Sequence, residues 1–151
     1  MKSILKLFTA IFFFSVINVT LAADVPADAV AMVEKGLSYL NKNSKEGLIA
    51  EINNKNPEFI KGDIYLYVRS IDGIILAHPV NAKLVGKNML ELPDADGKLY
   101  RKDIVNLAKT KGKGWVDYRY NNPVSKEVEN KSTYIVRTGD IILEAGIYKT
   151  K

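Results

Sequence analysis

Residues 64–86, IYLYVRSIDGIILAHPVNAKLVG, decide the fold because they read as two strands joined by a tight turn. Asp72-Gly73 lies between two runs of alternating side chains. This pattern favours a two-residue type I′ turn, which needs a positive φ at both central residues. Such a turn would place Tyr67 directly opposite His78 on the neighbouring strand.

The predicted hairpin has two different faces, because side chains alternate along a strand. One face is aromatic and polar and carries the only histidine of the chain: Tyr65, Tyr67, Arg69, Leu76 and His78. The other face is apolar: Leu66, Val68, Ile75 and Ala77. We therefore expect a sheet that packs against helices on one side and holds something on the other.

The first 22 residues read as a secretory signal peptide and not as part of the domain. Lys2 and Lys6 precede an apolar segment, and the small residues Ala22-Ala23 favour cleavage between them. An uncleaved membrane anchor is the alternative, although the apolar run is short for a span of ~20 residues. The sequence thus predicts a periplasmic protein with one domain over residues 23–151.

Composition narrows the class of protein further. The predicted signal peptide holds two of the 22 basic residues and none of the 17 acidic ones, so the remaining domain carries a net charge of +3. This mild, dispersed charge does not indicate nucleic-acid binding. The absence of cysteine excludes disulfides and thiolate sites, and one histidine offers no evident metal site or nucleophile–base pair. We expect no enzyme, no metal and no other cofactor.

Helical periodicity marks three segments. Residues 24–43 show one apolar stripe, and Ser44 is a suitable N-cap for a second helix over residues 45–53. Residues 98–111 form the third predicted helix, and the preceding segment 94–97 reads as a turn because it lacks the ligand spacing of a calcium loop.

Further strands are predicted over residues 115–120, 132–137 and 141–148. Gly139-Asp140 between the last two favours a Gly-first turn of the II′ kind. Five strands with short turns and helices grouped at the start predict an antiparallel sheet in an α+β domain.

Five blocks of sequence follow one another along the chain: EGLIAEINN, GDIYLYVRSIDGIILAHPVNAKLVGKN, DADGK, GKGWVDYRYNNPVSKEVENKSTYIV and AGIY. In this order they resemble the single Cache domain family, over roughly residues 30–148. The resemblance implies a PAS-like fold, with an antiparallel sheet of five or six strands and a long N-terminal helix packed on one face. It also implies an extracytoplasmic sensor of small molecules, commonly organic acids, that serves chemoreceptors and histidine kinases.

The chain departs from the family pattern in two ways. Family members usually lie between two membrane helices with a signalling domain downstream, whereas this sequence stops at Lys151. We therefore expect a free-standing binding protein, or a partner that presents ligand to a membrane chemoreceptor or histidine kinase. In addition, Tyr120 stands where a tryptophan is common in the family.

The expected ligand is a small carboxylate of the acetate, propionate, pyruvate or lactate class. Binding such an anion needs charge-assisted donors, with hydroxyl groups in an apolar wall to orient it. The candidate ligand-binding residues are Tyr67, His78, Tyr118, Tyr120, Lys131 and Tyr134. Lys131 is the candidate counter-ion, and Arg69 and Arg101 could replace it in that role.

Each candidate also has a structural interpretation. His78 precedes Pro79 and could simply satisfy a loop backbone group, and most lysines are solvated. The alternative function is therefore an interaction protein whose pocket is vestigial and whose surface binds a membrane receptor or another envelope partner.

Overall fold

The computed structural model describes residues 26–149, in which three α-helices accompany a six-stranded antiparallel sheet. The helices are α1 (Pro26–Leu40), α2 (Lys45–Asn53) and α3 (Tyr100–Thr110). The strands are β1 (Ile60–Lys61), β2 (Ile64–Ser70), β3 (Ile75–Ala77), β4 (Lys113–Asn121), β5 (Val128–Thr138) and β6 (Ile141–Tyr148). The predicted α+β class is confirmed, whereas the predicted signal peptide lies outside the described residues.

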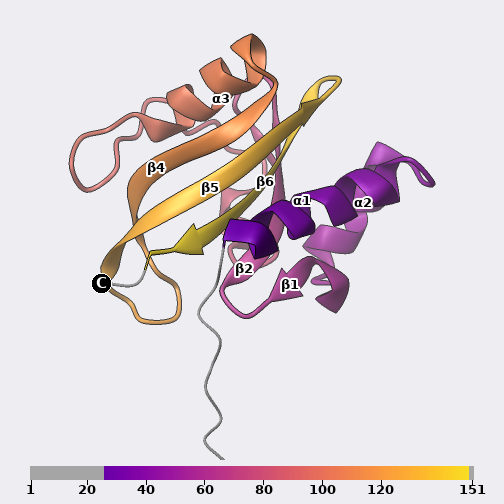
Figure 1. Ribbon diagram of the computed structural model, residues 1–151, viewed down its shortest axis with the longest axis horizontal. Helices are drawn as coiled ribbons and strands as arrows, with labels where there is room; N and C mark the ends of the chain where they lie inside the picture. Colours follow the sequence, from indigo (N-terminus) through magenta and orange to yellow (C-terminus); the bar gives the residue numbers. More distant parts are fainter. Residues whose placement is uncertain (1–25, 150–151) are drawn as a thin grey trace, which may run out of the picture.

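The sheet separates the helices into two groups (Figure 1). Its strand order is β1-β2-β6-β5-β4, with β3 paired to β2. Helices α1 and α2 cover the face that carries the apolar side chains of β2 and β6, here called the back face. Helix α3 packs on the front face against β4 and β5. The predicted packing of a long N-terminal helix on one face is confirmed.

Helix α1 approaches the back face closely because Gly36 has no side chain. A Cβ atom at Gly36 would lie 2.6 Å from a methyl carbon of Leu66 and 2.8 Å from one of Leu143. The buried side of the helix consists of Ala29, Met32, Val33 and Gly36. Small residues thus set the distance between helix and sheet.

The hairpin between β2 and β3 differs from the predicted one. Arg69 pairs with Ile75 and Val68 with Ala77, so the strand bulges at Leu76. Gly73 has a φ of 95°, but the φ of Asp72 is not positive. A type I′ turn requires a positive φ at both residues. The bulge moves Ile75 to the tyrosine face and Leu76 to the helix-covered face, which reverses the prediction for both residues.

The second hairpin matches its prediction. Tyr134 pairs with Ala145 and Ile135 with Glu144, and the connecting residues are Gly139-Asp140. Gly139 has a φ of 59°, as the first position of a II′ turn requires. This two-residue turn fixes which side chains of β5 and β6 reach the front face.

The turn at residues 94–97 is fastened to the edge of the sheet by one carboxylate. Asp94 Oδ2 accepts a hydrogen bond of 2.9 Å from the backbone N–H of Arg119 on β4. Its other oxygen accepts from the backbone N–H groups of Asp96 and Lys98 at 2.9 and 2.8 Å. Over residues 26–149, no cluster of three or more His, Cys, Asp or Glu side chains is placed to bind a metal ion.

The three α-helices described are 15, 9 and 11 residues long. Between residues 26 and 149, none combines the length and the apolar character needed to cross a bilayer.

Substitution of Gly36 tests the close packing of α1. We expect Gly36→Ala to lower the free energy of unfolding by about 1–3 kcal/mol, because the added methyl group overpacks against Leu66 and Leu143. Urea denaturation measures the change. Ser38→Ala on the exposed side of the same helix is the matched control and should change stability little. Equal stability of the two variants would contradict the packing argument.

Candidate functional site

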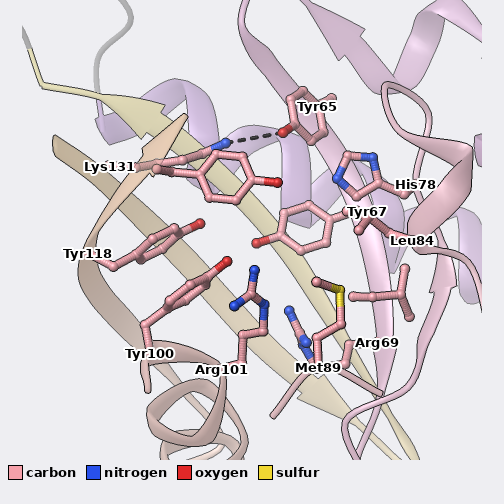
Figure 2. Close-up of a pocket in the computed structure, with 12 residues that line it drawn as sticks. Tyr65, Tyr67, Arg69, His78, Leu84, Met89, Tyr100, Arg101, Tyr118 and Lys131 are labelled. Carbon is pink, nitrogen blue, oxygen red and sulfur yellow. Dashed lines mark hydrogen bonds between the residues drawn. The ribbon is translucent and has the colours of Figure 1, made fainter. Parts of the chain in front are cut away.

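A small cavity lies between the front face of the sheet, the start of α3 and the loop that follows β3. Its volume is about 20 Å³, enough for about one water molecule. The lining side chains come from β2, β3, β4, β5, α3 and residues 78–89. Figure 2 shows the hydroxyl groups of Tyr67, Tyr100 and Tyr118 directed into the space between sheet and helix.

Lys131 lies in the middle of a row of three neighbouring residues on the front face. In the strand register, Lys131 pairs with Tyr118 of β4 on one side and with Tyr148 of β6 on the other. Its ammonium group donates to the hydroxyl oxygens of Tyr65 and Tyr148 at 3.2 and 3.3 Å, the first of which Figure 2 shows as a dashed line. Only 2% of the residue is exposed.

Three aromatic rings surround the Lys131 ammonium group. Its nitrogen lies 4.5 Å from the ring centroid of Tyr148, 4.8 Å from that of Tyr65 and 5.2 Å from that of Tyr120. Ring faces at these distances attract a cation but do not neutralise it. Burial lowers the Lys131 pKa to about 7, although the charges of Asp63 and Glu144 partly oppose this.

Gly146 on β6 makes room for the Lys131 side chain. A Cβ atom there would lie 2.5 Å from Lys131 Cε and 2.6 Å from Thr133 Oγ1. The lysine chain therefore lies across the backbone of the neighbouring strand, and its amine is directed toward the tyrosines.

His78 follows β3 and lies against two tyrosines of β2. Its ring centroid is 5.1 Å from that of Tyr65 and 5.3 Å from that of Tyr67. Nδ1 accepts a hydrogen bond of 3.0 Å from the backbone N–H of Asn81, so the neutral ring carries its proton on Nε2. Burial, together with the positive charges of Lys131 and Arg69, lowers the His78 pKa to about 4.

Arg69 and Glu144 form a buried ion pair on the same face. Arg69 Nε donates to Glu144 Oε1 at 2.6 Å, and a second nitrogen donates to Oε2 at 3.3 Å. The remaining nitrogen, NH1, is buried and has no hydrogen-bond partner in the structure. Burial alone would lower the Arg69 pKa, but Glu144 raises it, so the guanidinium group keeps its charge.

Helix α3 contributes two side chains that the sequence analysis did not place in the site. Tyr100 stacks on Tyr118 with ring centroids 3.7 Å apart and an interplanar angle of 4°. Arg101 lies over the Tyr100 ring at 4.3 Å and donates to the backbone oxygen of Leu92 at 2.9 Å. The sequence pattern offers Arg101 only as a substitute for Lys131 in the role of counter-ion. It gives no reason to place Tyr100 in the site.

Five of the six candidate residues line the cavity: Tyr67, His78, Tyr118, Tyr120 and Lys131. Tyr134 does not, so its prediction as a pocket wall is wrong. It pairs with Trp115 and Ala145 and lies on the back face, with its ring 5.2 Å from Trp115. Trp115 itself is 38% exposed.

The arrangement suits an anionic group with oxygen acceptors. Burial raises the pKa of the Tyr65, Tyr67 and Tyr118 phenols, so these hydroxyl groups stay protonated and can donate hydrogen bonds. Tyr118 already shares a hydrogen bond of 2.8 Å with the hydroxyl of Thr133. A cation and several neutral donors thus converge on one small space.

Comparison with known families identifies the domain. The family described as Cache domain matches residues 27–143, which is most of the chain. The chain therefore belongs to the Cache domain family, and the predicted family and PAS-like fold are confirmed.

Solved structures agree on the fold. A periplasmic sensor domain of a chemotaxis protein superposes with a TM-score of 0.64 and 20% identity, over 82% of this chain and 90% of that one. A Cache chemosensory domain, described in a study of carboxylic acid recognition, gives 0.63 and 23% over 82% and 88%. A methyl-accepting chemotaxis protein from Vibrio parahaemolyticus gives 0.65 and 19% over 81% and 84%.

Among curated proteins, the methyl-accepting chemotaxis protein McpP of Pseudomonas putida is 28% identical over 88 residues. The aligned segment is 57% of this chain but only 16% of that protein. The chain thus spans a small part of the relative that it matches.

The His78 environment predicts a pH dependence of stability. The unfolded chain binds a proton at His78 below about pH 6.5, whereas the folded chain does so only below about pH 4. The free energy of unfolding should therefore fall as the pH drops through this window, by on the order of 3 kcal/mol. Urea denaturation at several pH values measures this loss.

His78→Asn is the matched variant, since the amide oxygen can still accept the Asn81 N–H. It should lack this part of the pH dependence. An equal loss of stability in the variant would show that His78 is not the titrating group.

Proposed function

We propose that this chain is an extracytoplasmic sensor domain that binds a small carboxylate in the front pocket, with Lys131 as the counter-ion. The ligand class is that of acetate, propionate, pyruvate and lactate. The bound state would be read by a membrane chemoreceptor or a histidine kinase. The domain acts either as a free-standing binding protein or as the input part of a receptor.

The observation that carries this proposal is the buried amine of Lys131. In residues 26–149 no carboxylate is ion-paired with it, although ion pairs stabilise other lysines of the chain. A buried ammonium group without an anion is costly, and a ligand carboxylate would supply the missing partner. The phenols of Tyr65 and Tyr148 already hold the amine beside the cavity.

The second support comes from Arg69. Glu144 uses two of its nitrogens, and the third is a buried donor without a partner on the wall of the same cavity. Buried donors are nearly always satisfied in proteins. A ligand oxygen at this end of the pocket would satisfy it.

The relatives agree with this assignment. One structural neighbour was described for carboxylic acid recognition, and the curated relative is a methyl-accepting chemotaxis protein. These similarities support the choice of ligand class. The charges and hydrogen-bond donors of this pocket are the physical reason for it.

One observation favours a second candidate function, that of an interaction protein with a vestigial pocket. The cavity has room for about one water molecule, so binding of a carboxylic acid requires side chains to move. If the tyrosines fill the space permanently, the domain would serve instead as a docking partner for an envelope protein.

A thermal-shift experiment separates the two candidates. The chain is heated with sodium salts of carboxylic acids of two to four carbons. We expect a melting temperature that rises and saturates with at least one acid, because a ligand that binds only the folded state stabilises it. Lys131→Met removes the charge and should abolish the shift. No shift with any acid would favour the interaction protein.

Removal of one hydroxyl group tests the pocket wall. Tyr118→Phe should weaken binding of the responding acid by about 1 kcal/mol, or roughly fivefold, the value of one hydrogen bond. Tyr134→Phe is the matched control, since that hydroxyl group belongs to the back face. Calorimetric titration gives both affinities. Equal affinities for the two variants would remove Tyr118 from the binding site.

A further inference from the structure

The Lys131 amine is buried among tyrosine side chains on the wall of the cavity. Two phenol oxygens and three aromatic rings surround it, and Gly146 lets its side chain lie flat across β6. Burial therefore removes most of the hydration that the charged amine would have in water. In such a place burial disfavours the charged form of the amine, and a neighbouring anion favours it.

Several other ionisable groups surround Lys131. Burial raises the pKa of the surrounding phenols, so they remain neutral: Tyr65 and Tyr67 on β2, Tyr100 on α3, Tyr118 on β4 and Tyr148 on β6. The lowered pKa of His78, about 4, keeps that ring neutral as well.

The charged side chains near the amine are two guanidinium groups and two carboxylates. Arg69 is paired with Glu144, while Arg101 on α3 lies over the Tyr100 ring. Asp63, just before β2, acts on Lys131 from outside hydrogen-bond distance. Lys131, whose pKa is lowered to about 7, is therefore the group near the cavity whose charge changes in the physiological range.

We propose that the pocket binds its carboxylate together with one proton, which the neutral Lys131 amine takes up as the anion enters. The proposal rests on the proposed function. In the balanced step, a carboxylate, a proton from solvent and the Lys131 amine form an ammonium–carboxylate pair. The pocket gains no net charge, because the anion and the proton arrive together.

Proton uptake determines whether the domain responds to the undissociated acid or to the carboxylate. When the amine is neutral in the free protein, occupancy depends on the product of carboxylate and proton concentrations. That product is proportional to the concentration of the undissociated acid. Above neutral pH the domain would thus report the uncharged acid, the form that crosses membranes unaided. At lower pH, with the amine already protonated, it would report the carboxylate alone.

Calorimetric titration over pH 6 to 9 tests this proposal, with sodium acetate, sodium propionate and sodium pyruvate as probes. These acids are fully ionised throughout this range. We expect a Kd that is nearly constant at pH 6 and rises toward tenfold per pH unit above about pH 7.5. At pH 8.5, titrations in phosphate and in Tris should give heats that differ by the uptake of about one proton per ligand.

Lys131→Arg separates the amine from other sources of pH dependence, because a guanidinium group stays protonated over the whole range. Its Kd should not vary between pH 6 and 9, and a slope that persists in the variant would overturn the proposal. If arginine does not fit, the ¹³Cε resonance of Lys131 in the labelled native chain decides. It should titrate near pH 7 without ligand and remain that of a protonated amine with saturating ligand.

The two proposals fail in different ways. Binding of an acid with a Kd independent of pH, and with equal heats in both buffers, would overturn proton uptake and leave the proposed function intact. Absence of binding by all three acids at every pH, including pH 6, would overturn both.

Discussion

The front face of this domain depends on the buried ion pair between Arg69 and Glu144. Both groups are almost completely removed from water, and loss of either partner would leave an unpaired charge in the sheet, at a cost of about 3–5 kcal/mol. Both oxygens of Glu144 accept hydrogen bonds from Arg69, whereas the Lys131 amine donates to the phenol oxygens of Tyr65 and Tyr148. The pair thus joins β2 to β6 on this face, and the carboxylate of Glu144 is ion-paired with Arg69 and not with the neighbouring amine.

The positions of the pocket residues follow from the alternation of strands. Tyr67, Tyr118 and Lys131 share a face because each strand presents every second residue to it. The Gly139-Asp140 turn holds β5 and β6 in the register that brings Lys131 beside Tyr148. Alternation also explains why the prediction for Tyr134 is wrong. Tyr134 lies three residues after Lys131 on β5, so the two side chains are on opposite faces of the sheet.

Other features were not predictable from local patterns. The bulge at Leu76 depends on how residues 71–74 satisfy their backbone groups, and Asp72-Gly73 fits more than one turn. The pairing of Arg69 with Glu144 requires β2 and β6 to be neighbours, which is a matter of topology. Tyr100 enters the site only because α3 packs across the front face, and apolar periodicity says nothing about which polar residue then meets the sheet.

The carboxylate of Asp94 has a consequence for solubility. Strand β4 is the outer strand of the sheet, and an outer strand with free backbone donors can recruit a strand from a second molecule. Asp94 occupies the Arg119 N–H, and the turn that it organises lies along this border. The turn at residues 94–97, which precedes α3, therefore also hinders self-association through the addition of a strand at β4.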